Sequence, residues 1–198
     1  MGLAQKNSKF YTPAEYLELE RQADVRHELL DGEIYEMAGA NKRHNRISVN
    51  VVRLLDTQLL ERECSVYGSD MRVKIAATGK YTYPDVVAVC GEEFFEDETE
   101  DTLLNPMLII EVLSKSTEGY DRGGKFEYYQ TIESFNEYVL IAQEPFRVEQ
   151  FVRKERNVWT YFEFRQPDDI VKLHSVNCEL VLQDIYHKIQ QKFPKEVI

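Results

Sequence analysis

The chain has 198 residues, of which 43% are hydrophobic and 30% charged, and its formal net charge is −11 at pH 7. This composition predicts one globular domain with a full core, and the negative charge argues against holding nucleic acid by bulk electrostatics. No apolar run approaches the ~18 residues of a membrane span, and the N-terminus lacks the apolar segment of a secretory signal. We expect a cytoplasmic protein with a single domain over residues 10–190 and a disordered N-terminus over residues 1–9.

The first third of the chain carries strong helix and turn signals. Thr12, Pro13 and Glu15 form a capping-box pattern that predicts a helix over residues 12–22. The Asp31-Gly32 pair between two strand-like stretches predicts a hairpin over residues 27–37.

An amphipathic helix is predicted over residues 41–63, where apolar residues recur every three or four positions. Four basic or imidazole side chains occupy its first turn: Lys42, Arg43, His44 and Arg46. Cations at this end oppose the helix dipole, so the cluster indicates either contact with an anion or a solvated face of small cost.

Strand and helix patterns alternate through the rest of the chain. Strands are predicted over residues 64–67, 70–75, 83–89 and 107–113, followed by a helix over 122–132 and a buried strand over 136–141. Further strands are predicted over 148–153, 158–163 and 170–173, and a closing helix over 180–191. The order between residues 42 and 141 predicts an α/β fold of the α+β kind, with helices on the faces of a mixed sheet.

Two local features have more than one reading. Residues 92–101 hold seven acids and no base, which is typical of a solvated connection and less often of a partner-binding element. The three cysteines, Cys64, Cys90 and Cys178, are odd in number and lack CxxC spacing, so neither a zinc site nor a disulfide framework is indicated. We expect reduced, buried thiols.

Two acids lie within strand-like apolar runs, Asp85 in residues 83–89 and Glu111 in residues 107–113. An ionised acid in such a run needs a cation, a hydrogen-bonding partner or a shifted pKa, because unpaired burial is costly. If the two strands pair, the carboxylates converge and offer hard oxygen ligands suited to Mg²⁺ or Mn²⁺. Structural ion pairs, for instance with Lys125, remain the alternative.

Lys125 lies early in the helix that follows the Glu111 strand, so a short crossover would bring it near the carboxyl end of that strand. A lysine beside a metal-bound water can stabilise negative charge or assist proton transfer in phosphoryl chemistry.

Four segments together are similar to the Uma-type family of "putative restriction endonucleases", which belongs to the PD-(D/E)XK nuclease superfamily. They are residues 83–87, 106–117, 120–129 and 137–141; residues 26–34 and His44 also resemble the family, so the match spans residues 10–187. The resemblance implies a restriction-endonuclease-like core of helix-strand-strand-strand-helix-strand with an added N-terminal hairpin and C-terminal strands, often in a homodimer.

The resemblance also implies metal-dependent phosphodiester hydrolysis. Asp85 and Glu111 would be metal ligands, the Val112 carbonyl a further ligand, and Glu28 and His44 groups that line the site. The superfamily's usual lysine, two residues after the second acid, is replaced here by Leu113. Lys125 is the expected functional equivalent.

These observations leave three hypotheses. The leading one is a Mg²⁺- or Mn²⁺-dependent DNA endonuclease with Asp85, Glu111 and Lys125 as its catalytic residues. The second is a catalytically silent homodimeric binding module that keeps the fold, which the net charge of −11 favours. The third is a nuclease acting on RNA or on branched or damaged DNA, since a fold does not choose among substrates.

Overall fold

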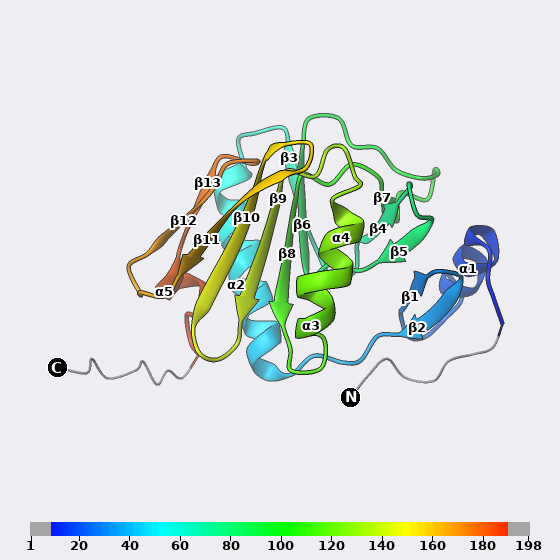
Figure 1. Cartoon of the computed structure of the whole chain (residues 1–198), viewed down its shortest axis with the longest axis horizontal. Helices are drawn as coiled ribbons and strands as arrows, with labels where there is room; N and C mark the ends of the chain where they lie inside the picture. The colour runs from blue at the N-terminus through cyan, green and yellow to red at the C-terminus, as the bar shows by residue number, and fades with distance from the viewer. Residues whose placement is uncertain (1–8, 190–198) are drawn as a thin grey trace.

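A computed structural model of the chain describes residues 9–189, and its centre is a six-stranded mixed sheet (Figure 1). The strand order is β11-β10-β9-β8-β6-β3. The strands are β3 (Cys64–Gly68), β6 (Val86–Cys90), β8 (Leu108–Leu113), β9 (Glu137–Ala142), β10 (Arg147–Glu155) and β11 (Val158–Phe164). Strands β8 and β9 are parallel, as expected for a crossover, and every other neighbouring pair is antiparallel.

Helices cover both faces of this sheet. Helix α2 (Lys42–Leu59) packs on one face, and the other is covered by one helical segment made of α3 (Glu118–Tyr120), the π-helical turn η1 (Asp121–Lys125) and α4 (Phe126–Tyr129) (Figure 1). The strand period of two divides the apolar side chains between the faces. Along β8, Ile110 and Val112 face α2, whereas Ile109 and Leu113 face α4.

A second sheet lies beside the first, with strand order β2-β1-β5-β4-β7. It contains β1 (His27–Leu30), β2 (Glu33–Glu36), β4 (Arg72–Ile75), β5 (Lys80–Thr82) and β7 (Thr102–Leu103). Helix α1 (Pro13–Glu20) packs against it and begins with the predicted capping box at Thr12. The predicted hairpin is confirmed, and Asp31 and Gly32 have φ of 52° and 80°, as a tight turn of this twist requires.

The C-terminal part differs from its prediction. The hairpin of β12 (Ile170–Leu173) and β13 (Cys178–Val181) is followed by a single short helix, α5 (Leu182–Ile185). A helix over residues 180–191 is therefore wrong at its start, because Leu180 and Val181 pair with β12, and residues 190–191 lie outside the described part. Between residues 9 and 189, no helix has the length and apolar character needed to cross a membrane.

The expectation of three reduced cysteines is also wrong for two of them. Cys64 and Cys90 stand directly opposite each other in the β3–β6 pair and form a disulfide, whereas Cys178 is a free, buried thiol. The two residues are 26 apart in sequence, and only the pairing register brings them together.

Candidate functional site

Asp85 lies just before β6, at the point where the chain leaves one sheet for the other. Residues 83–89 were expected to form one strand; instead Thr82 ends β5 and Val86 begins β6, with Pro84 in the break. Proline lacks the N–H that a continuing ladder needs. Asp85 consequently lies outside the strand ladder, at the end of the sheet, where it is only partly buried.

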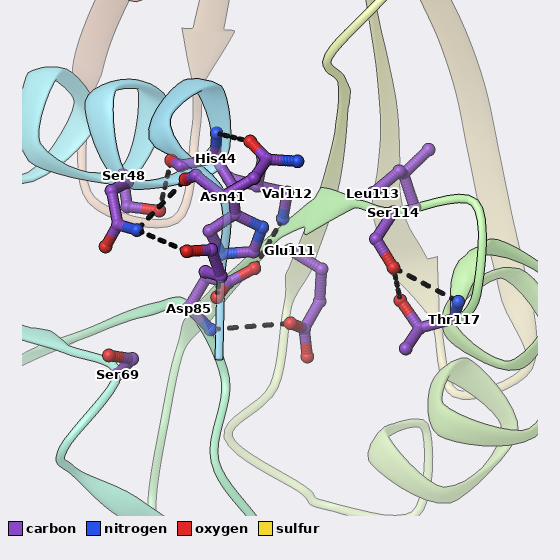
Figure 2. Close-up of polar contacts among 12 residues, drawn as sticks. Asn41, His44, Ser48, Ser69, Asp85, Glu111, Val112, Leu113, Ser114 and Thr117 are labelled. Carbon is purple, nitrogen blue, oxygen red and sulfur yellow. Dashed lines mark hydrogen bonds and ion pairs between the residues drawn. The ribbon is translucent and has the colours of Figure 1, made fainter. Parts of the chain in front are cut away.

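The register of β6 and β8 brings the two acids together. Val86 pairs with Ile110 and Val87 with Ile109, so the next step along the two strands places Asp85 opposite Glu111. The Asp85 backbone N–H points at Glu111 Oε2, 3.4 Å away, and the Val112 N–H donates to Asp85 Oδ2 at 2.7 Å (Figure 2). The register therefore places Asp85 and Glu111 next to each other at this end of the sheet.

His44 reaches the same carboxylate from helix α2. Asn41 caps this helix by accepting hydrogen bonds from the backbone N–H groups of Arg43 and His44, so the first turn is well defined. From that turn, His44 Nε2 lies 2.7 Å from Asp85 Oδ1 (Figure 2). Both oxygens of Asp85 therefore have a partner, which fixes the orientation of the carboxylate.

Lys125 is buried beside Glu111 at the end of the π-helical turn. Its Nζ lies 3.1 Å from Glu111 Oε1, 3.2 Å from Glu28 Oε1 and 3.8 Å from Asp121 Oδ1. Glu28 comes from β1 of the second sheet and also accepts a hydrogen bond from the Tyr83 N–H. The two sheets and the crossover helix all contribute to this cluster. It brings together the side chains expected from the sequence, and the Val112 backbone contacts it through Asp85.

Two members of the cluster were not expected. Asp121 lies one helical turn before Lys125, and Tyr129 one turn after it, where its hydroxyl lies 3.3 Å from Glu111 Oε1. Their i,i+4 spacing around Lys125 was a usable signal, because residues four apart share one helix face. The cluster residues are therefore Glu28, His44, Asp85, Glu111, Asp121, Lys125 and Tyr129.

Negative charge exceeds positive charge in this cluster: three carboxylates contact the Lys125 ammonium group, and a fourth, that of Asp85, belongs to a residue that adjoins Glu111. Burial is the main cause that raises the pKa of Glu111 well above its ordinary value; Lys125 works against it, and the Asp85, Asp121 and Glu28 carboxylates add to it. Burial likewise raises the pKa of Asp121. For Lys125, burial acts to lower the pKa, but the surrounding acids outweigh it and the pKa is raised.

The cluster opens to the surface through Asp85. A hollow of about 450 Å³ lies between helix α2 and the end of β3, and Ser48, Ser69 and Asp85 are among its lining residues. Glu111 and Lys125, by contrast, are 3% and 6% exposed. Leu113, which replaces the superfamily's lysine, is buried in the core on the α4 side of the sheet and brings no charge to the cluster.

Among the described residues, the side chains that could bind a metal do not form a complete ligand set. Within residues 9–189, no three His, Cys, Asp or Glu side chains are grouped as a preformed set of metal ligands. Asp85 and Glu111 are two carboxylate residues that adjoin at the end of β6 and β8, and carboxylate oxygens are a donor type to which Mg²⁺ can bind together with waters.

Comparison of the sequence with known proteins identifies a family and two similar proteins. The family model described as "Uma2: Putative restriction endonuclease" matches residues 13–183. Two uncharacterized proteins of Synechocystis sp. are similar: sll1609 is 41% identical over 79% of this chain and 88% of its own length, and slr1290 is 33% identical over 88% and 90%.

The fold has a solved counterpart. A crystal structure from Anabaena variabilis, described as a "putative nuclease belonging to DUF820", superposes with a TM-score of 0.73 over 88% of this chain and 97% of that chain, at 17% sequence identity. Such a match shows that the two chains share the fold of the mixed sheet and its helices, and a restriction-endonuclease-like core is consistent with it. With the family match over residues 13–183, it follows that the chain belongs to the Uma2 family.

Proposed function

We propose that this protein is a Mg²⁺- or Mn²⁺-dependent endonuclease that hydrolyses phosphodiester bonds in DNA. One observation carries the proposal: two carboxylates and an ammonium group from distant parts of the chain meet at the end of one sheet. Asp85 and Glu111 adjoin across β6 and β8, and Lys125 Nζ lies 3.1 Å from Glu111 Oε1. The description of the family supports the reaction class.

The residues present fit a divalent cation. Three carboxylates contact the Lys125 ammonium group and Asp85 adjoins Glu111, so acids outnumber cations here. Burial is the first cause of the raised pKa of Glu111 and its acidic neighbours add to it, so a cation beside Glu111 would offset part of this cost. Asp85, Glu111 and the Val112 carbonyl would hold the ion, all through the hard oxygens that Mg²⁺ and Mn²⁺ prefer. When bound, the ion polarises a phosphoryl oxygen and makes water a better nucleophile at neutral pH.

The chain's own groups have distinct tasks in this proposal. His44 and the Val112 N–H hold the Asp85 carboxylate in one orientation at the floor of the hollow. Lys125 supplies a fixed positive charge that stabilises negative charge building up on the phosphoryl group. Glu28 and Glu111 both contact the Lys125 ammonium group, so that it is already placed before substrate arrives.

Cleavage of plasmid DNA tests the proposal. The purified chain with Mn²⁺ should convert supercoiled DNA to nicked or linear forms, and Glu111→Gln should lower the rate by roughly two orders of magnitude or more, because it removes a charged ligand. Glu155→Gln is the matched control, since Glu155 is exposed on β10 at the other end of the sheet. Equal cleavage by Glu111→Gln and the unaltered chain would refute the proposed site.

The nucleic-acid substrate and the homodimer are tested by separate experiments. Parallel reactions with linear, single-stranded and branched DNA and with RNA distinguish DNA cleavage from the alternative nuclease activities. The homodimer implied by the family resemblance stays a prediction, and light scattering coupled to gel filtration would test it by giving twice the mass of the chain, which is 23.3 kDa.

A further inference from the structure

The outer face of helix α2 carries cations that have no acidic partner. Arg46 and Arg53 are exposed and lie seven residues apart, two helical turns or ~10 Å along one face. In the described part of the chain neither forms an ion pair, whereas Arg43 in the same helix pairs with Glu144. Other cations in the described part of this acidic protein are paired with acids, among them Arg21, Arg72 and Lys74.

The same two arginines line a hollow of about 480 Å³. His187 and Lys188, which follow α5, form the opposite side, and Asp184 is its single carboxylate. Asn50, buried to 4% exposure, fixes this geometry from beneath: its Nδ2 donates to the carbonyl oxygens of Ile185 and His187, each at 2.9 Å. The basic side chains after α5 are thereby held against α2.

This basic hollow adjoins the hollow that contains Asp85. Both are lined by Val49 and Arg53, which form the ridge between them. Asp56 is the further acid on the Asp85 side. A chain-like ligand seated at Asp85 can therefore continue over Arg53 and into the basic hollow.

The distribution of charge favours an anionic ligand on this face. The acidic segment 92–101 is engaged with other elements, since Arg21 pairs with Asp97 and Asp101, and Lys74 pairs with Glu96. Repeated phosphates attract cations whose charge is not already neutralised, and arginine suits phosphate geometry. The α2 face offers such cations in a row.

We propose that the phosphodiester backbone of a nucleic-acid strand runs over the outer face of α2, from the Asp85 hollow across Arg53 to Arg46 and Lys188. This proposal rests on the proposed nuclease function, because that function places a phosphodiester at Asp85. Of the basic residues at the start of α2, it assigns Arg46 to anion contact, whereas Arg43 pairs with Glu144 and His44 with Asp85.

Binding without cleavage provides the test. The change in anisotropy of fluorescein-labelled DNA is measured in EDTA for the unaltered chain and for Arg46→Glu/Arg53→Glu. The matched control is Lys154→Glu/Arg156→Glu, which changes the net charge equally. These two cations are exposed and unpaired among the described residues. Lys154 lies near the end of β10 and Arg156 in the β10–β11 turn, at the end of the sheet away from Glu111.

The α2 variant should bind about tenfold more weakly or worse, and the slope of log affinity against log salt should fall by about 2, one unit per lost phosphate contact. The control should change far less. Equal loss in both variants, or no DNA binding by the unaltered chain, would overturn the inference. Arg46→Gln/Arg53→Gln repeats the test with neutral side chains, and circular dichroism checks that each variant is folded.

The outcomes separate this inference from the proposed function. Binding that depends on α2 without any cleavage in Mn²⁺ would keep the binding surface and reject the hydrolase. Cleavage by the unaltered chain that the α2 variant matches in rate and in KM would keep the hydrolase and reject the binding surface.

Discussion

At the scale of single residues, the defining property of the site is a buried excess of negative charge. Lys125 faces Glu28, Glu111 and Asp121, and Asp85 adjoins Glu111. A buried charge without full compensation costs stability, and here that cost is concentrated where a cation would bind. Burial raises the pKa of Glu111 first, and its acidic neighbours raise it further, because both disfavour the charged form of this carboxyl group.

This imbalance predicts how stability depends on pH. Because the pKa of Glu111 is raised in the folded chain, its favourable contribution is present below the ordinary carboxyl pKa and is lost as the pH rises through the raised value. Glu111→Gln keeps the side chain neutral. In EDTA it should raise the free energy of unfolding at neutral pH by about 1 kcal/mol or more, and the gain should fall toward zero near about pH 4.

Urea denaturation followed by circular dichroism at a series of pH values measures this effect. Glu155→Gln, an exposed site, should change stability little at any pH. A loss of stability in Glu111→Gln at neutral pH would mean that the attraction between Glu111 and Lys125 outweighs the excess of acids.

At the scale of elements, the crossover segment is decisive because it positions Lys125. Its π-helical turn, Asp121–Lys125, adds a residue per turn, and both end residues are buried toward Glu111. The turn contains Gly123 and Gly124, which sequence patterns mark only as weak helix formers. The structure distinguishes them by what surrounds each.

Alanine at the two glycines should therefore have different effects. A Cβ at Gly123 meets nothing within 4 Å, so Gly123→Ala should stabilise the chain by about 0.5–1 kcal/mol through helix propensity. A Cβ at Gly124 would lie 3.0 Å from an atom of the Tyr120 ring. Lys125 Nζ lies over this ring, 5.9 Å from its centroid. Gly124→Ala should be less stable than Gly123→Ala in thermal melts, and equal melting temperatures would contradict this account.

At the scale of the whole molecule, the candidate site joins elements that are distant in sequence. Glu28 comes from the second sheet, His44 from α2, Asp85 from the link between the sheets, and Lys125 from the crossover. A ligand bound by the folded chain alone raises its stability by mass action. The assembled site thus has a readout that does not depend on activity.

Addition of Mn²⁺ should raise the melting temperature, with a gain of ~2.7 kcal/mol when its concentration is a hundred times the dissociation constant. Asp85→Asn should abolish this rise, because it removes one of the two carboxylates. A catalytically silent binding module, the alternative function, would show no rise that depends on Asp85. Differential scanning fluorimetry with Mn²⁺ therefore distinguishes the two functions before any substrate is known.

The sequence by itself determined the local elements, the strand faces and the candidates for the site. Capping at Thr12, the Asp31-Gly32 turn and the spacing of acids and apolar residues are local signals, and Asp85, Glu111 and Lys125 were identifiable from them. Residues 83–89 were misread as one strand because a local pattern cannot say which sheet each half joins.

Only the tertiary structure decided which distant groups meet. The Cys64–Cys90 disulfide depends on the β3–β6 register, the third carboxylate at Lys125 on the π-helical turn, and the basic hollow on the packing of α5 against α2. Pairing register and packing are set by the burial of non-local apolar surface, to which local sequence patterns are blind.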